Sequence, residues 1–138
     1  MVFADPPYNV AIDGHATGPG RIQHREFEMA SGEMTEREFR NFLSQVFYNL
    51  AEHSSDGSLH YICMDWRHMG ELLAAGRHVY SKLMNVCTWT KDNAGMGSLY
   101  RSQHEIVFVF KNGHGVHRNN VQPGHCCRRR QTYVRCGS

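Results

Sequence analysis

Four residues near the N-terminus have the types and the order that could hold an amino group beside an aromatic ring. Asp5, Pro6, Pro7 and Tyr8 follow a short apolar run, Val2-Phe3-Ala4. The Asp5 carboxylate and a neighbouring backbone carbonyl would supply two hydrogen-bond acceptors, which suit an amino group with two N–H donors. The Tyr8 ring would offer a face on which a planar base can stack. The sequence therefore predicts a site for a flipped-out base with an exocyclic amine, and the alternative is an Asp-Pro turn that only ends a strand.

Four further residues are candidates for this site, because each lies beside the tetrapeptide or next to the end of an apolar run: Asn9, Asp65, His104 and Glu105. His104 and Glu105 could form an acid/base pair. They could instead orient a loop or satisfy polar groups at the start of a strand. For Asp65, capping of the following helix competes with a role as a catalytic acid.

The elements that must position these residues follow from the apolar pattern. We expect strands at 2–4, 59–64, 83–89 and 106–110, with the first strand buried. One helix starts at Thr35, where Thr35 and Glu38 match a capping box. Its apolar face comprises Phe39, Phe42, Leu43, Val46, Phe47 and Leu50. A second helix is expected over residues 66–76, with Asp65 as its cap and Gly76 as its end.

This order of strand, helix, strand, helix, strand, strand indicates an α/β fold. Parallel strands would be joined by right-handed crossovers, and the last two strands would pair antiparallel. Ligand sites of open α/β sheets lie beyond the carboxyl ends of the strands. The tetrapeptide occupies such a position after the first strand. Residues 9–33 contain several glycines and predict a long loop.

Composition limits the class of protein. The chain has 138 residues, of which 41% are hydrophobic, and this fits one globular domain. No apolar run is long enough to span a membrane and no signal peptide is visible, so we expect a cytoplasmic protein without membrane contact. Cys63 and Cys87 lie in apolar runs and are expected to be buried, reduced thiols.

Charge is distributed unevenly along the chain. Residues 1–113 have a balance of −3, whereas residues 114–138 contain five arginines and no acidic residue. We expect residues 1–113 to form the folded domain and residues 114–138 a basic, irregular tail. Arg128-Arg129-Arg130 could contact phosphates or could be a solvated charge run. The tail also contains His114, His117, His125, Cys126, Cys127 and Cys136, but their spacing matches no zinc finger, so no metal site is expected.

Asp-Pro-Pro-Tyr after an apolar strand resembles the catalytic motif of the amino-directed DNA methyltransferases, which make N6-methyladenine or N4-methylcytosine. The segments FADPPYN, DGSLHYICMDW, LMNVCTWTKDN and YRSQHEIVFVFKNG extend the resemblance over about residues 2–113. It implies a partial Rossmann-like methyltransferase sheet, DNA as substrate and S-adenosylmethionine as methyl donor. The Asp form of the motif more often goes with adenine, and the Ser form with cytosine.

The resemblance also implies a role for each residue of the tetrapeptide. Asp5 and the Pro6 carbonyl would accept hydrogen bonds from the target amine. Pro7 would hold the shape of the loop, and Tyr8 would stack on the base. The amine would then attack the methyl group of the cofactor, with acceleration coming mainly from positioning and desolvation.

The Phe-x-Gly-x-Gly segment with which such enzymes bind the cofactor is not visible. Gly95-Met96-Gly97 and Gly113-His114-Gly115 lack the expected strand and helix on either side. The sequence therefore looks like the catalytic-motif half of an enzyme, inactive alone, whose cofactor half could lie downstream or on a second chain. One alternative is a truncated, inactive remnant that at most binds nucleic acid. Another is an N4-cytosine methyltransferase.

Overall fold

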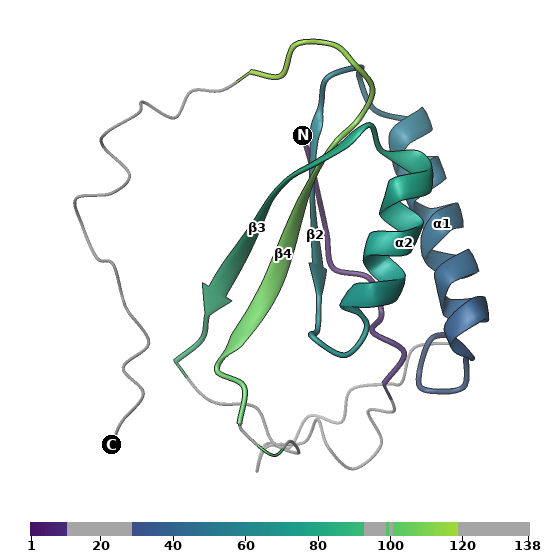
Figure 1. The fold of residues 1–138 in the computed structure, drawn as a ribbon, viewed down its shortest axis with the longest axis vertical. Helices are drawn as coiled ribbons and strands as arrows, with labels where there is room; N and C mark the ends of the chain where they lie inside the picture. Colours follow the sequence, from purple (N-terminus) through teal and green to yellow (C-terminus); the bar gives the residue numbers. More distant parts are fainter. Residues whose placement is uncertain (11–28, 93–98, 100, 119–138) are drawn as a thin grey trace, which may run out of the picture.

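Four strands form a single mixed sheet, and two helices cover one of its faces (Figure 1). The computed structural model describes residues 1–10, 29–92, 99 and 101–118. In chain order the elements are β1 (Val2–Ala4), α1 (Glu36–Glu52), β2 (Leu59–Met64), α2 (Met69–Val79), β3 (Lys82–Thr90) and β4 (His104–Lys111). This is the predicted α/β class with a partial Rossmann-like sheet, and each predicted strand is present.

The strand order is β1-β2-β4-β3. β1 runs parallel to β2, with Ala4 opposite Ile62, and β4 is antiparallel to both of its neighbours. The predicted antiparallel pairing of the last two strands is therefore confirmed. β4 lies between β2 and β3, so the two strands that α2 connects point the same way without being neighbours. The carboxyl ends of β1, β2 and β3 and the start of β4 meet at one end of the sheet (Figure 1).

The predicted capping box begins α1. The Thr35 hydroxyl accepts a hydrogen bond from the Glu38 backbone N–H at 3.3 Å, and the Glu38 carboxylate accepts one from the Thr35 N–H at 2.9 Å. The bond from the Thr35 N–H, and then a second one that the Thr35 hydroxyl donates to the same carboxylate, hold the pKa of Glu38 below its usual value. The predicted apolar face points at the sheet, because Phe39, Leu43 and Phe47 are fully buried. Local sequence signals thus predict correctly both the residue at which α1 begins and the face of the helix that is buried.

The prediction for α2 was wrong at both ends. The helix begins at Met69, with His68 as its N-cap, and it continues to Val79. Asp65 accepts a hydrogen bond from the His68 N–H at 3.0 Å, which forms a turn that keeps residues 65–68 out of the helix. Gly76 lies inside the helix, where a Cβ atom would be 2.6 Å from the Phe110 ring. A glycine is needed there for close approach of helix and sheet, so it does not end the helix.

Two predictions of burial were also wrong. Phe3 in β1 is 63% exposed, because β1 is an edge strand and the helices cover only the other face of the sheet. Cys87 is exposed as well, in strand β3, where no residue is buried. Cys63, in the inner strand β2, is buried as predicted. An apolar run therefore identified each strand but not the number of its covered faces.

A buried polar cluster joins the end of α1 to the sheet. His60 is fully buried, with its Nε2 atom 2.8 Å from the Ser54 hydroxyl and its Nδ1 atom 3.0 Å from the Tyr80 hydroxyl. Asn112 donates to the Ser54 hydroxyl at 3.1 Å and to the Ala51 carbonyl at 3.0 Å. Both ring nitrogens of the histidine are thus paired, and burial lowers the pKa of His60.

Several predictions concern residues outside the described part of the chain. These are most of the predicted 9–33 loop, the glycine-rich segment 93–98, and the tail beyond residue 118, which includes His125 and the three C-terminal cysteines. Within the described residues, neither helix has the length and apolar character needed to cross a bilayer.

Candidate active site

A cleft opens at the end of the sheet where β1 and β2 finish and β4 begins. Its volume is about 240 Å³, below the roughly 300–1,000 Å³ typical of sites for drug-sized ligands. The lining residues come from distant parts of the chain: Tyr8, Val10, Asp65, Trp66, Arg67, Lys91, Ser102, His104, Glu105 and Ile106. A cleft of this size has room for one small chemical group that enters from solvent.

The tetrapeptide lies at the carboxyl end of β1, and Tyr8 brings it into the cleft. Asp5 is exposed, Pro6 is buried, and Pro7 and Tyr8 are half-buried. The Tyr8 hydroxyl donates a hydrogen bond to Asp5 Oδ1 at 2.6 Å. Burial, and then this bond, raise the pKa of Tyr8 well above its usual value. Tyr8 is therefore a neutral phenol that orients the Asp5 carboxylate, whose remaining lone pairs can accept from a second donor.

Asn9 does not line the cleft but fixes the backbone that leaves the tetrapeptide. Its Nδ2 donates to the Met34 carbonyl at 2.8 Å, and its Oδ1 accepts from the backbone N–H groups of Met34 and Gly32, both at 3.1 Å. Its φ of 53° lies in the left-handed region, which asparagine tolerates better than most residues. Asn9 thereby ties the tetrapeptide to the turn that precedes α1.

Asp65 lines the cleft, yet both of its oxygens have local partners. Oδ1 accepts from the His68 N–H and also lies 3.0 Å from His68 Nδ1. Oδ2 lies 3.5 Å from Arg67 Nη1. The structure thus places Asp65 in a turn-stabilising position at the rim of the cleft.

His104 and Glu105 lie together at the start of β4 and line the same cleft. Glu105 forms an ion pair with Lys91, which follows the neighbouring strand β3. His104 is exposed. Glu105 therefore links two strands at the cleft, while the His104 side chain is accessible to a ligand.

Cys63 lies one residue past the Ile62 that pairs with β1, but its thiol is not a reactive group. It is 1% exposed, and burial raises its pKa to about 11. A neutral, buried thiol is a poor nucleophile. No group of three or more His, Cys, Asp or Glu side chains in the described residues has an arrangement that would hold a metal ion.

Sequence reasoning did not identify Trp66, Arg67, Lys91 or Ser102 as cleft residues. Trp66 is 51% exposed, with the Arg67 guanidinium 5.3 Å from its ring centroid. Their position directly after Asp65, at the carboxyl end of a strand parallel to β1, was a usable signal. For Lys91 and Ser102 no comparable signal exists, because the pairing of β3 with β4 brings them to the cleft.

The described residues form a cleft at the strand ends but no glycine-rich cradle for a nucleoside cofactor beside it. Gly113 and Gly115 lie beyond β4, at the opposite end from the start of that strand. There they pack against Asp56, and a Cβ atom on Gly115 would be 2.7 Å from Asp56 Oδ2. Backbone N–H groups, that of Gly115 foremost, lower the pKa of Asp56. This glycine pair therefore closes a turn and does not fit a cofactor-binding loop next to the cleft.

A model of the DNA methylase family, which covers the N6- and N4-directed enzymes, matches residues 1–130. The match begins before the tetrapeptide and includes every strand of the sheet. No curated protein matches the chain.

Proposed function

The chain belongs to the amino-directed DNA methylase family, and on that premise we propose that its cleft holds a base flipped out of DNA for methylation. The acceptor would be the exocyclic amine, with adenine N6 preferred. The methyl donor would be S-adenosylmethionine, which this family generally uses. DNA is the corresponding macromolecular partner.

One observation carries the proposal. Tyr8, Asp65 and His104 come from three separate segments of the chain, and the fold brings all three into one cleft of about 240 Å³. Asp5 is hydrogen-bonded to Tyr8 at its edge. A concave cleft in which polar groups from distant segments converge is more typical of a binding site than of a turn that only ends a strand.

In this proposal each residue of the tetrapeptide has a distinct task. Asp5 accepts one N–H of the target amine while it keeps the bond from Tyr8, and the Pro6 carbonyl accepts the other N–H. Pro7 fixes φ and keeps the loop in shape. The Tyr8 ring stacks on the base. Two acceptors aimed at one amine orient its nitrogen lone pair toward the position of the incoming methyl group.

When bound, S-adenosylmethionine would supply an electrophilic methyl group on a sulfonium centre. The side chains of this cleft would hold the acceptor base and exclude water from around its amine. The half-buried Tyr8 and buried Pro6 support such desolvation. His104 and Glu105 would border the bound base from the β4 side.

The preference for adenine rests on the Asp form of the tetrapeptide, and N4 of cytosine is the alternative acceptor. We also propose that residues 1–113 form the catalytic-motif half of a DNA methyltransferase domain and that residues 114–138 are a basic, irregular tail. Digestion of the modified DNA to nucleosides, followed by mass spectrometry, distinguishes N6-methyladenine from N4-methylcytosine.

The test is transfer of labelled methyl groups from S-adenosylmethionine to DNA, with a cofactor-binding half supplied alongside the wild-type chain, Asp5→Ala or Asp92→Ala. Asp92 is exposed and follows β3, so its replacement is a matched control. We expect Asp5→Ala to lower the rate at least about 10²-fold, as misplacement of a reacting group does, while Asp92→Ala stays at the wild-type rate. Full activity of Asp5→Ala would refute the role of Asp5. A wild-type chain that binds DNA but transfers no methyl group would support the inactive remnant instead.

A further inference from the structure

A second cavity lies on the surface formed by the two helices. Its volume is about 420 Å³, and it is lined by Glu36, Arg37, Arg40, Arg67, Gly70, Glu71 and Ala74. Arg37 and Arg40 come from the first turns of α1, and Gly70, Glu71 and Ala74 from α2. We call this cavity the arginine groove, because three guanidinium groups line it.

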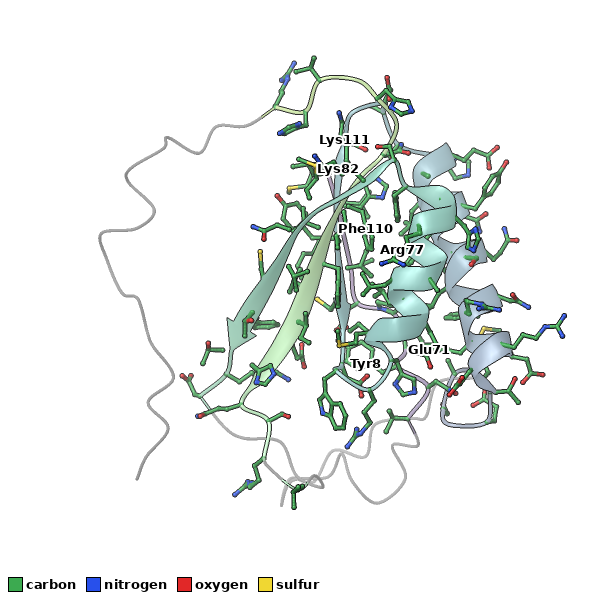
Figure 2. All side chains as sticks on the ribbon, viewed as in Figure 1. Tyr8, Glu71, Arg77, Lys82, Phe110 and Lys111 are labelled. Carbon is green, nitrogen blue, oxygen red and sulfur yellow. The ribbon has the colours of Figure 1, made fainter. Side chains whose placement is uncertain are left out.

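The arginine groove adjoins the candidate active site. Arg67 lines both cavities, so the two meet at this residue. Glu71 and Tyr8 lie toward the same end of the molecule in Figure 2, whereas Lys82 lies toward the other end. A strand that enters the cleft would therefore pass this groove with its neighbouring nucleotides.

The charges of the groove suit an anion that reaches it from outside. Residues 1–113 contain ten Lys and Arg against thirteen Asp and Glu, yet three of the ten line this one groove. Ion pairs between described residues involve neither Arg37 nor Arg40. Glu36 and Glu71 also line the groove, so its lining carries three positive and two negative side chains and keeps a positive balance.

The spacing of the arginines fits a polyanion. Arg37 and Arg40 are three residues apart on one helix, so their Cβ atoms lie about 5–6 Å apart on the same face. A guanidinium group presents parallel N–H donors that match two phosphate oxygens. Two such groups side by side could each hold one phosphate of a strand.

We propose that the arginine groove binds the DNA backbone next to the flipped nucleotide. This inference rests on the proposed function, since it takes DNA as the partner. Arg37 and Arg40 would contact phosphates, and Arg67 would hold the strand where it turns into the cleft. Such contacts position the DNA without reading its sequence.

The test is the salt dependence of binding to a short fluorescent DNA duplex, measured by anisotropy with the full chain. The variants are Arg37→Gln with Arg40→Gln, and Arg77→Gln as the matched control. Arg77 is an exposed arginine in the last turn of α2 and is not a lining residue of the groove. Circular dichroism and thermal unfolding of each variant check that the fold is intact.

Loss of two phosphate contacts should reduce the slope of log K against log salt by about 1.8, at about 0.9 for each phosphate. Between about 50 and 200 mM salt the wild-type affinity should then fall about tenfold more than that of the double variant. Arg77→Gln should keep the wild-type slope. The proposal would be overturned if the wild type and the double variant had equal slopes, or if Arg77→Gln showed the same reduction in slope. It would also be overturned if the wild-type chain did not bind the duplex.

Failure of the proposed function gives a different pattern. Asp5 is not a groove residue, so Asp5→Ala should bind DNA with the wild-type slope while methyl transfer is lost. Full methyl transfer by Asp5→Ala would refute the role of Asp5 whatever the slopes are. Unchanged slopes in the double variant, with an inactive Asp5→Ala, would refute the groove alone.

Discussion

Replacement of Gly76 by alanine should destabilise the protein, although alanine is the better helix former. A Cβ atom at this position would lie 2.6 Å from the Cε1 and Cζ atoms of the Phe110 ring. Phe110 is 1% exposed and cannot turn aside freely. It stacks on Tyr80 with ring centroids 4.9 Å apart and contacts Phe47 at 6.2 Å. Either α2 or the aromatic cluster must therefore shift to accommodate one methyl group.

Two opposing effects set the magnitude. Alanine in a helix interior is about 1 kcal/mol more favourable than glycine. Overpacking of a well-packed core costs about 1–3 kcal/mol, and the rigid surroundings of Phe110 favour the upper half of that range. The free energy of unfolding should then fall by about 1–2 kcal/mol. For a chain of this length this lowers Tm by roughly 4–8 °C.

Gly70 in the same helix provides the matched control. Nothing lies within 4 Å of a Cβ atom built on Gly70, so Gly70→Ala should leave Tm unchanged or raise it slightly. Thermal unfolding followed by circular dichroism measures both variants under identical conditions. A Gly76→Ala protein as stable as Gly70→Ala would show that close contact with Phe110 is not the reason for glycine in α2.

Three further predictions follow from the buried and partly buried polar groups. Asn9→Ala loses three hydrogen bonds to Gly32 and Met34 and keeps an unfavourable φ. Urea denaturation should therefore show that the free energy of unfolding falls by about 2–3 kcal/mol. A fall below about 0.5 kcal/mol would contradict the role of Asn9 in holding the tetrapeptide to the turn before α1. Burial lowers the pKa of His60, so its contribution to stability is complete above the unfolded value of about 6.5 and declines as pH falls toward the folded pKa. The stability difference between wild type and His60→Gln should accordingly narrow from pH 7.5 to pH 5, and a constant difference would refute this. Iodoacetamide at about pH 8 should modify the exposed Cys87 well before Cys63, because burial raises the pKa of Cys63 to about 11. Peptide mass spectrometry measures the two rates of modification, and equal rates would contradict this prediction.

The position of α1 shows how much local sequence can determine. Its start depends on the side chain of Thr35 and a glutamate three residues later, and its buried face depends on apolar residues spaced for a helix. All of these interactions lie within a few residues of each other along the chain. The four strands were predictable for the same reason, because a short run of apolar and β-branched residues needs no distant partner to be recognised.

The candidate site was predictable in part. The Asp-Pro-Pro-Tyr sequence after a strand pointed to Asp5 and Tyr8, and positions next to the ends of apolar runs pointed to Asp65, His104 and Glu105 as neighbours. The structure brings Tyr8, Asp65, His104 and Glu105 to one cleft. Their roles in catalysis stay predictions that the Asp5→Ala experiment tests first.

Other features depend on which residues become neighbours in space. β4 inserts between β2 and β3, and this pairing alone joins Lys91 to Glu105 at the cleft. From the sequence, Gly76 was predicted to end a helix. In the structure it lies inside α2, where Phe110 of β4 occupies the space beside it.

The sequence by itself determined the elements and the order of the chemical groups along them, because caps, periodicity and turn residues act over short distances. The tertiary structure decided which strand faces are covered and which side chains share the cleft and the arginine groove. Those outcomes depend on strand order and register, which arise from the summed packing of residues distant in the chain. No single segment contains that information.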